Sequence, residues 1–182
     1  MDQEKLIKSC INQDKQAQEA LYHLYKKTLF VLCLKYCANE AEAEDILHDS
    51  FIEIYTNIKN YKGNGSFEGW IKRITINKAI NKYKQSHLLV PLKDTYNEVT
   101  SIEEVEINLS LDIILSLIQN LPHQYRLVFN LYELDDYSHK DIAKMLSISE
   151  GTSKSNLHRA KLLLKENILK NTNYNYILKH GK

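Results

Sequence analysis

The sequence is poor in the residues that interrupt helices, with 5 glycines and 2 prolines among 182 residues. Glycine and proline punctuate turns and weaken helix interiors, so their scarcity argues against a fold built from many tight turns. Leu, Ile, Lys and Glu are abundant instead, and apolar residues recur at the 3.6-residue period of an amphipathic helix. We therefore predict an all-α protein.

Cysteine is also scarce, and the three residues are Cys10, Cys33 and Cys37. An odd number does not make a disulfide framework, so we expect reduced thiols. Cys33 and Cys37 have the spacing of two metal ligands on a helix. No second Cys/His pair with ligand spacing follows, and a closed zinc site needs four ligands. We interpret the pair as small buried residues and predict no metal and no cofactor.

Long apolar runs and bulk charge are lacking as well. No run is long enough to cross a bilayer, and the N-terminal residues lack the basic start and apolar stretch of a signal peptide, so we expect a cytoplasmic protein without direct membrane insertion. The formal net charge is only +1. The charges alternate in blocks: acidic over 40–53, basic over 59–87, acidic again up to 108, and basic over 138–170. Blocks of this size indicate that different segments meet different partners.

The most informative stretch runs from Tyr137 to Leu164 and predicts two short helices joined by a tight turn. We expect the first over 139–146 with Ser138 as N-cap, and the second from about 150 past Leu164. The apolar face of the second helix consists of Leu157, Ala160 and Leu164. Its opposite face carries hydrogen-bond donors and positive charge, at Lys154, Ser155, His158 and Arg159. Such a helix fits the major groove of DNA. An ordinary amphipathic hairpin with a solvated basic face is the alternative.

In the first half, the periodicity predicts helices over 6–13, 16–38, 41–58 and 66–86. Core candidates of the second of these are Leu21, Leu24, Tyr25, Phe30, Val31 and Leu34. The helix over 41–58 carries a row of carboxylates at Glu42, Asp45, Asp49 and Glu53, without lysine partners four residues on. This row is either a solvated face or a docking surface for a basic protein. No nucleophile, phosphate loop or His/carboxylate triad accompanies it, so we expect no enzyme.

The clearest loop of the first half spans 61–67 and contains two glycines, which permit unusual backbone angles and close approach of a ligand. The helix that follows places an aromatic ring, amides and cations on one face, at Trp70, Arg73, Asn77, Asn81 and Lys84. This combination suits contact with single-stranded nucleic acid. Trp70 can equally be a core residue.

The periodicity breaks between 88 and 108, where Pro91 and a series of acids predict a flexible acidic linker. We therefore expect two small helical domains, 1–87 and 109–170, the second ending in the helix-turn-helix. Within the second domain we expect helices over 109–121 and 123–134. Residues 171–182 form a polar tail to which we assign no role.

Two parts of the sequence resemble one family, the bacterial RNA polymerase sigma factors of the extracytoplasmic-function group. Region 4 of that family is similar to LPHQYRLVFNLYELDDYSHKDIAKMLSISEGTSKSNLHRAKLLLK. Region 2 is similar to ALYHLYKKTLF, AEAEDILHDSFIEIYTNI and FEGWIKRITINKAINKYKQ. Both matches in the family's order, with an acidic linker between them, imply a sigma factor that binds core RNA polymerase and directs promoter recognition, melting and transcription initiation. The alternative is a stand-alone helix-turn-helix regulator with an N-terminal dimerisation or sensing domain.

The resemblance also implies which residues act. Polymerase clamp helices would be bound by Asp45, His48, Asp49, Ile52 and Glu53. The −10 element would be melted and bound by Lys62, Asn64, Ser66, Phe67, Trp70, Arg73, Asn77, Asn81 and Lys84. The −35 element would be bound by Thr152, Lys154, Ser155, Asn156, His158 and Arg159. The implied partners are core RNA polymerase (clamp helices and flap), promoter DNA and an anti-sigma factor.

The chain departs from the family pattern at several positions. Asp141 replaces the usual Glu, Lys84 stands where Arg is common, and His48-Asp49 stands where Gln-Glu is common. Ser153 stands where the family mostly has an apolar residue, so the resemblance does not supply the packing at the start of the recognition helix.

Overall fold

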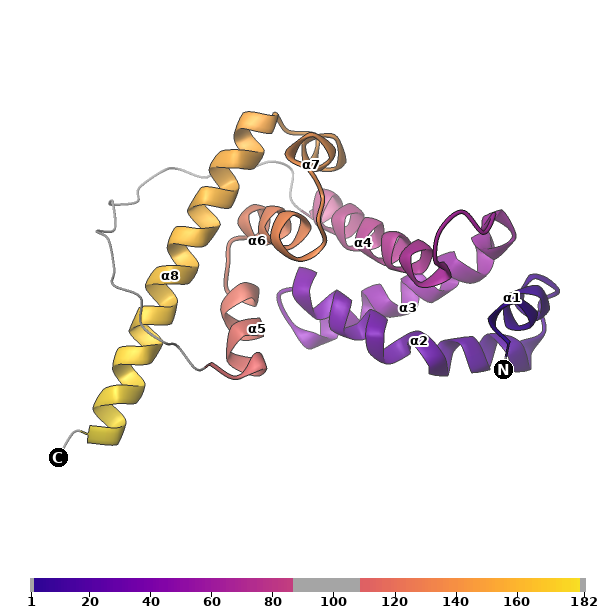
Figure 1. Ribbon diagram of the computed structural model, residues 1–182, viewed down its shortest axis with the longest axis horizontal. Coiled ribbons are helices and arrows are strands. Elements are labelled where there is room, and N and C mark those ends of the chain that lie inside the picture. Colours follow the sequence, from indigo (N-terminus) through magenta and orange to yellow (C-terminus); the bar gives the residue numbers. More distant parts are fainter. Residues whose placement is uncertain (1, 87–108, 181–182) are drawn as a thin grey trace. The chain divides into compact units, whose positions relative to one another are not determined.

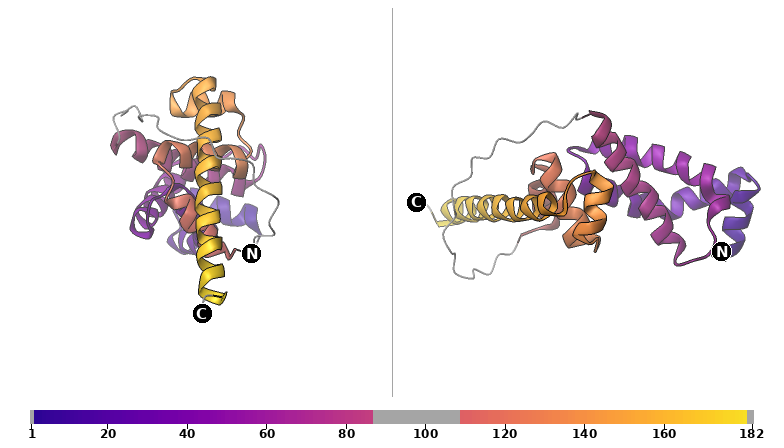
Figure 2. Two further views of the ribbon diagram at one scale, coloured as in Figure 1. Left: turned by 90° about the vertical axis from the view of Figure 1, so that its left-hand side faces the viewer. Right: turned by 90° about the horizontal axis from the view of Figure 1, so that it is seen from above.

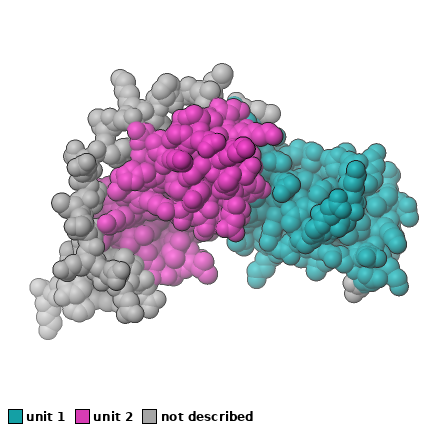
Figure 3. Space-filling view, turned by 45° about the horizontal axis from the view of Figure 1, so that its top comes forward, with its two compact units in different colours: residues 1–86 teal, residues 87–182 magenta. Residues whose placement is uncertain are grey.

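The computed structural model describes residues 2–86 and 109–180, and all the elements it contains in these ranges are helices, as predicted (Figure 1). The predicted linker, 88–108, lies outside the described residues. The chain divides into two compact units, residues 1–86 and 87–182 (Figure 3). In the described part of the chain, no helix combines the length and the apolar character that a bilayer span requires.

Unit 1 contains four α-helices and one short 3₁₀ turn. They are α1 (Gln3–Ile11), α2 (Lys15–Tyr36), α3 (Glu40–Asn57), η1 (Ile58–Asn60) and α4 (Phe67–Ser86). The starts of the first three helices follow from capping side chains. Asp2, Asp14 and Asn39 accept hydrogen bonds from backbone N–H groups in the first turns of α1, α2 and α3. These caps explain why α1 begins before the first apolar residue of its periodic pattern.

The core of unit 1 lies between α2, α3 and α4, which pack against one another (Figures 1 and 2). Leu21 and Tyr25 are buried in it, as predicted. The prediction was wrong for Leu24 and Val31, which are 59% and 51% exposed. Apolar residues occupy two faces of α2, and only the face that contains Leu21, Tyr25 and Leu29 meets the other helices.

The three cysteines are free thiols packed into unit 1. Cys33 and Cys37 are 0% and 1% exposed, which confirms their interpretation as small buried residues. Burial raises the pKa of the Cys33 thiol to about 12. Burial, assisted by the negative charge of Asp14, also raises the pKa of Cys10.

The native protein is therefore expected to resist thiol reagents at mildly alkaline pH. A buried thiol with a raised pKa holds little of the thiolate that reacts, so modification should be more than about tenfold slower than in the unfolded chain. The measurement is the rate of modification by a thiol reagent with and without denaturant. A fast-reacting thiol in the folded protein would contradict this placement of the cysteines.

Within residues 109–180, unit 2 contains four α-helices and one π-helical turn. They are α5 (Leu111–Gln119), α6 (His123–Phe129), η2 (Asn130–Leu134, the π turn), α7 (His139–Leu146) and α8 (Glu150–His180). The helix predicted over 123–134 is thus α-helical only up to Phe129. The predicted tail begins inside α8, because this helix continues to His180 (Figure 1).

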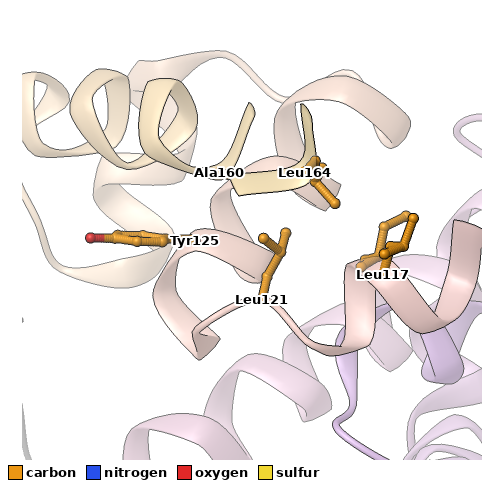
Figure 4. Close-up of a cluster of buried hydrophobic side chains, with 6 residues drawn as sticks. Leu117, Leu121, Tyr125, Ala160 and Leu164 are labelled. Atoms are coloured by element: carbon orange, nitrogen blue, oxygen red, sulfur yellow. The ribbon is translucent and has the colours of Figure 1, made fainter. Parts of the chain in front are cut away.

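The core of unit 2 forms where α5 and α6 pack onto the middle of α8. Leu117, Leu121 and Tyr125 contact the α8 residues Ala160 and Leu164 in one buried cluster (Figure 4). Leu157, Ala160 and Leu164 are all buried, which confirms the predicted apolar face of the helix. Truncating a leucine of such a cluster to alanine costs about 2–5 kcal/mol of stability.

Sequence analysis missed a buried cation in this unit. Arg126 is 1% exposed, and its guanidinium donates a hydrogen bond to the backbone carbonyl of Gln119. The guanidinium also lies 2.6 Å from Nδ1 of His123. Arg126 therefore satisfies a carbonyl at the C-terminal end of α5, where helix carbonyls have no intrahelical partner.

Candidate functional site

Side-chain caps define the helix-turn-helix of unit 2. Ser138 caps α7, because its hydroxyl oxygen accepts a hydrogen bond from the backbone N–H of Asp141 at 3.1 Å. The helix ends at Leu146, and the capping residue Ser147 that follows has a positive φ of 58°. Ser149 then accepts a hydrogen bond from the N–H of Thr152 at 3.0 Å and caps α8. The N-cap and the two helices agree with the sequence prediction.

The exposed face at the start of α8 is mostly the predicted one. Thr152, Lys154, Ser155 and His158 are exposed, and Arg159 is half-buried. These side chains offer hydroxyl, imidazole and cationic donors along about two helical turns. Asn156 is a correction, because it is only 4% exposed and its side chain lies in the unit's interior. The periodicity places Asn156 beside the buried Leu157, and only the packing decides which way it faces.

Two glycines set the path of the loop between α3 and α4. Gly63 and Gly65 have φ angles of +75° and +91°, which side-chain-bearing residues rarely adopt. The Tyr61 hydroxyl donates a hydrogen bond to the carbonyl of Gly65 at 2.7 Å. Ser66 then caps α4, accepting from the N–H of Gly69 at 3.0 Å. The loop is thus held at Gly65 and at the start of the next helix.

An aromatic cluster anchors this loop to α4. The Tyr61 ring lies 5.1 Å from the Phe67 ring and 5.6 Å from the Trp70 ring, measured between centroids. Phe67 is a correction to the predicted DNA-contacting set, because it is 2% exposed and belongs to the core. Trp70 is half-buried, so it packs on its neighbours and still presents part of its surface. Tyr61 begins the predicted loop but is not among the predicted DNA-contacting residues, although an aromatic residue beside a two-glycine loop was a usable signal.

The remaining predicted residues of α4 form an exposed row that starts near Trp70. Arg73, Asn77, Asn81 and Lys84 are all exposed, as are Lys62, Asn64 and Ser66 of the loop. The loop therefore contacts α4 at Trp70, and the exposed row continues from there along the helix.

The lysines on the neighbouring face of α4 reach the acidic row of α3. Lys78 Nζ lies 2.9 Å from a carboxylate oxygen of Glu53, and Lys82 Nζ lies 3.1 Å from one of Asp45. Exposed pairs of this kind contribute little to stability. Sequence analysis looked for partners four residues along the same helix and could not foresee partners on another helix.

The centre of the acidic row stays open to solvent. His48 and Asp49 are exposed, and Ile52 is 55% exposed beside them. The Asp45 side chain is 72% exposed despite its ion pair. An exposed apolar side chain flanked by carboxylates is a surface suited to a protein partner with basic residues.

The two units match two successive parts of one protein family. Residues 21–87 match the family model "Sigma-70 region 2", and residues 111–164 match "Sigma-70, region 4". The chain belongs to the sigma-70 family. Sigma factors of this family bind core RNA polymerase and direct it to promoters, and the alternative of a stand-alone regulator is not favoured.

Individual sigma factors show the same relationship along most of the chain. The ECF RNA polymerase sigma factor SigW of Bacillus subtilis is 29% identical over 178 residues, covering 90% of this chain and 95% of the relative. The ECF RNA polymerase sigma-E factor of Haemophilus influenzae is 25% identical over 177 residues, covering 90% and 93%. This sigma factor therefore falls in the extracytoplasmic-function group, as the resemblance implied.

A solved structure supports the fold. The sigma factor RpoE from Bartonella quintana, crystallised in complex with the anti-sigma factor NepR, superposes with a TM-score of 0.53. The sequences are 20% identical, and the match covers 84% of this chain and 96% of that one.

Proposed function

We propose that this sigma factor recognises two-part promoters with separate surfaces, the start of α8 binding the −35 element and the loop–α4 side of unit 1 opening and binding the −10 element. The observation that carries the proposal is the capped, exposed first part of α8, which presents donors and cations away from the unit's core. The two units act as separate DNA-binding domains joined through residues 88–108.

At the −35 element, we expect some exposed residues of α8 to contact base edges and others to contact phosphates. Arg159 and His158 can donate hydrogen bonds to base edges in the major groove, where each base pair presents a distinct pattern. Lys154, Thr152 and Ser155 suit contacts to phosphates and nearby bases, which fix the register of the helix on the duplex. Asn156 supports this surface from within the unit.

At the −10 element, the loop and α4 are suited to bind single-stranded DNA with unstacked bases. Unstacking a base costs a few kcal/mol, which contacts in a pocket and along the backbone must offset. Trp70 offers a partly exposed ring for stacking, Asn77 and Asn81 offer amides, and Arg73 and Lys84 offer charge for phosphates.

A Tyr61→Phe variant is expected to slow promoter opening by about two- to tenfold, because it removes the hydroxyl that donates a hydrogen bond to the carbonyl of Gly65. The matched control is Tyr55→Phe, which removes a similar hydroxyl–carbonyl bond, 2.9 Å long, to Gln18 in the same unit. The measurement is the rate of open-complex formation by the holoenzyme. Equal rates for the two variants would show that the loop does not need this contact.

The acidic side of α3 is the proposed site for the polymerase clamp helices, through Asp45, His48, Asp49, Ile52 and Glu53. Unit 2 is proposed to meet the flap of the polymerase. We also propose an anti-sigma factor as a regulatory partner, since the structurally similar RpoE was crystallised with one. The protein then acts in the cytoplasm, by binding rather than by catalysis.

The experiment that tests this function is transcription in vitro by core RNA polymerase on a library of random upstream sequences. With the protein added, the transcripts should come from templates that share two motifs at a fixed spacing. If no template is enriched while the protein alone still retains particular duplexes, the proposed promoter function fails and direct DNA regulation becomes the better account.

A further inference from the structure

One histidine connects three elements around the recognition helix. His139 begins α7, and its Nδ1 lies 2.9 Å from the hydroxyl oxygen of Ser153 in the first turn of α8. The ring also stacks on the ring of Tyr132 in the π turn, with centroids 4.3 Å apart and an angle of 20° between their planes. The imidazole is therefore held in a fixed orientation by one polar and one aromatic neighbour.

Ser153 lies where a small displacement would move the DNA-facing side chains. It is 0% exposed, while Thr152 before it and Lys154 after it are both exposed. Because neighbouring residues of a helix move together, the position of Ser153 sets the position of both. The Ser153 hydroxyl therefore makes a directional polar contact at a buried position of the recognition helix.

A polar contact constrains the helix start more sharply than an apolar one. A hydrogen bond requires a narrow range of distance and angle. Removing one partner leaves a buried polar group without compensation, whereas replacing both partners by apolar groups of similar shape can be nearly neutral. The difference between losing one partner and replacing both therefore distinguishes a positioning hydrogen bond from general packing.

The groups around His139 favour the uncharged form of its imidazole ring. Burial lowers the pKa of His139, and the positive charge of Lys154 lowers it further, while Glu150 acts in the opposite direction. The ring of Tyr132 faces it from the π turn, and Lys140 and Asp141 flank it on its own helix. A protonated ring would also place positive charge at the start of α7 and beside the first turn of α8, where helix dipoles disfavour it.

We propose that His139 is a positioning residue, which fixes the first turn of the recognition helix through Ser153 so that Thr152 and Lys154 meet the upstream element in register. The inference rests on the proposed −35 function of that helix. His139 and Ser153 would then influence promoter binding without touching DNA themselves.

The test uses three variants of the full chain, each assembled with core polymerase. His139→Phe keeps a ring on Tyr132 but removes Nδ1, Ser153→Val removes the hydroxyl, and the third variant carries both changes. Affinity is measured for a promoter obtained from the random library. Each single change should weaken binding by about five- to tenfold, and the double variant should return to within about threefold of the unaltered protein. Single variants that bind normally, or a double variant no better than the singles, would overturn the proposal.

A pH series gives a second readout. Because folding lowers the pKa of His139, its stabilising contribution is present above the ordinary histidine pKa of about 6.5 and is lost as the pH falls below it. Between about pH 8 and pH 5.5, the melting temperature of the unaltered protein should fall further than that of the double variant. Equal falls would contradict a role for the uncharged ring.

Arg159→Ala separates failure of this inference from failure of the −35 function. If Arg159→Ala weakens promoter binding but the single changes at 139 and 153 do not, only the positioning role fails. If Arg159→Ala also binds normally, the assignment of the recognition helix itself is wrong.

Discussion

An Asp49→Lys variant is expected to bind core RNA polymerase at least about tenfold more weakly, because placing like charges against each other at an interface costs several kcal/mol. Asp49 lies at the exposed centre of the acidic row, whereas Asp45 and Glu53 on either side are engaged by lysines of α4. A lysine at position 49 would repel a basic partner, while the rest of the α3 surface stays unchanged. The measurement is co-elution of the full chain with core polymerase at low salt.

The matched control is Glu4→Lys, which makes the same change of charge at an exposed residue of α1, outside the acidic row. This control should assemble normally, and Asp49→Lys should keep the helix content and thermal stability of the unaltered protein. If both reversals impair assembly equally, net charge rather than the α3 surface governs the interaction. If Asp49→Lys assembles normally, the clamp assignment is wrong.

An Arg159→Ala variant is expected to weaken promoter binding by about 1–3 kcal/mol, which is roughly five- to 150-fold, and to relax the sequence preference at one base pair. Arg159 is half-buried at the edge of the exposed α8 face. A bidentate contact to a base edge is the usual source of such discrimination. Binding should be measured for the preferred promoter and for variants of its upstream element.

Lys165→Ala provides the comparison for this variant, since it removes one exposed positive charge further along the same helix. A charge that meets only phosphates should weaken binding to all sequences alike and reduce the salt dependence slightly. If Arg159→Ala behaves in the same uniform way, Arg159 contacts the backbone and another residue of the helix carries the discrimination.

Local signals in the sequence were enough to locate the helix-turn-helix. Ser138 could be identified as an N-cap from its place before an apolar period, and Leu157, Ala160 and Leu164 could be identified as a buried stripe from their spacing. Such features depend on residues within one or two helical turns of each other, and this is the range over which periodicity and capping act.

Contacts between distant segments could not be foreseen in this way. Arg126 is buried where its guanidinium donates a hydrogen bond to a carbonyl of the preceding helix, and Lys78 meets Glu53 because α3 and α4 lie side by side. The exposure of Leu24 and the burial of Asn156 likewise depend on which helix face another helix covers. The family resemblance implies where the binding surfaces lie, and the packing decides which side chains there are exposed.

The central claim is that two separate surfaces of this sigma factor recognise two separate promoter elements. The most direct measurement repeats the random-library transcription with Arg159→Ala and with Asn77→Ala, and compares the motifs enriched by each. We predict that Arg159→Ala alters only the upstream motif and that Asn77→Ala alters only the downstream one. If either change altered both motifs, or if the two changes altered the opposite motifs, the division of promoter recognition between unit 2 and unit 1 would be contradicted.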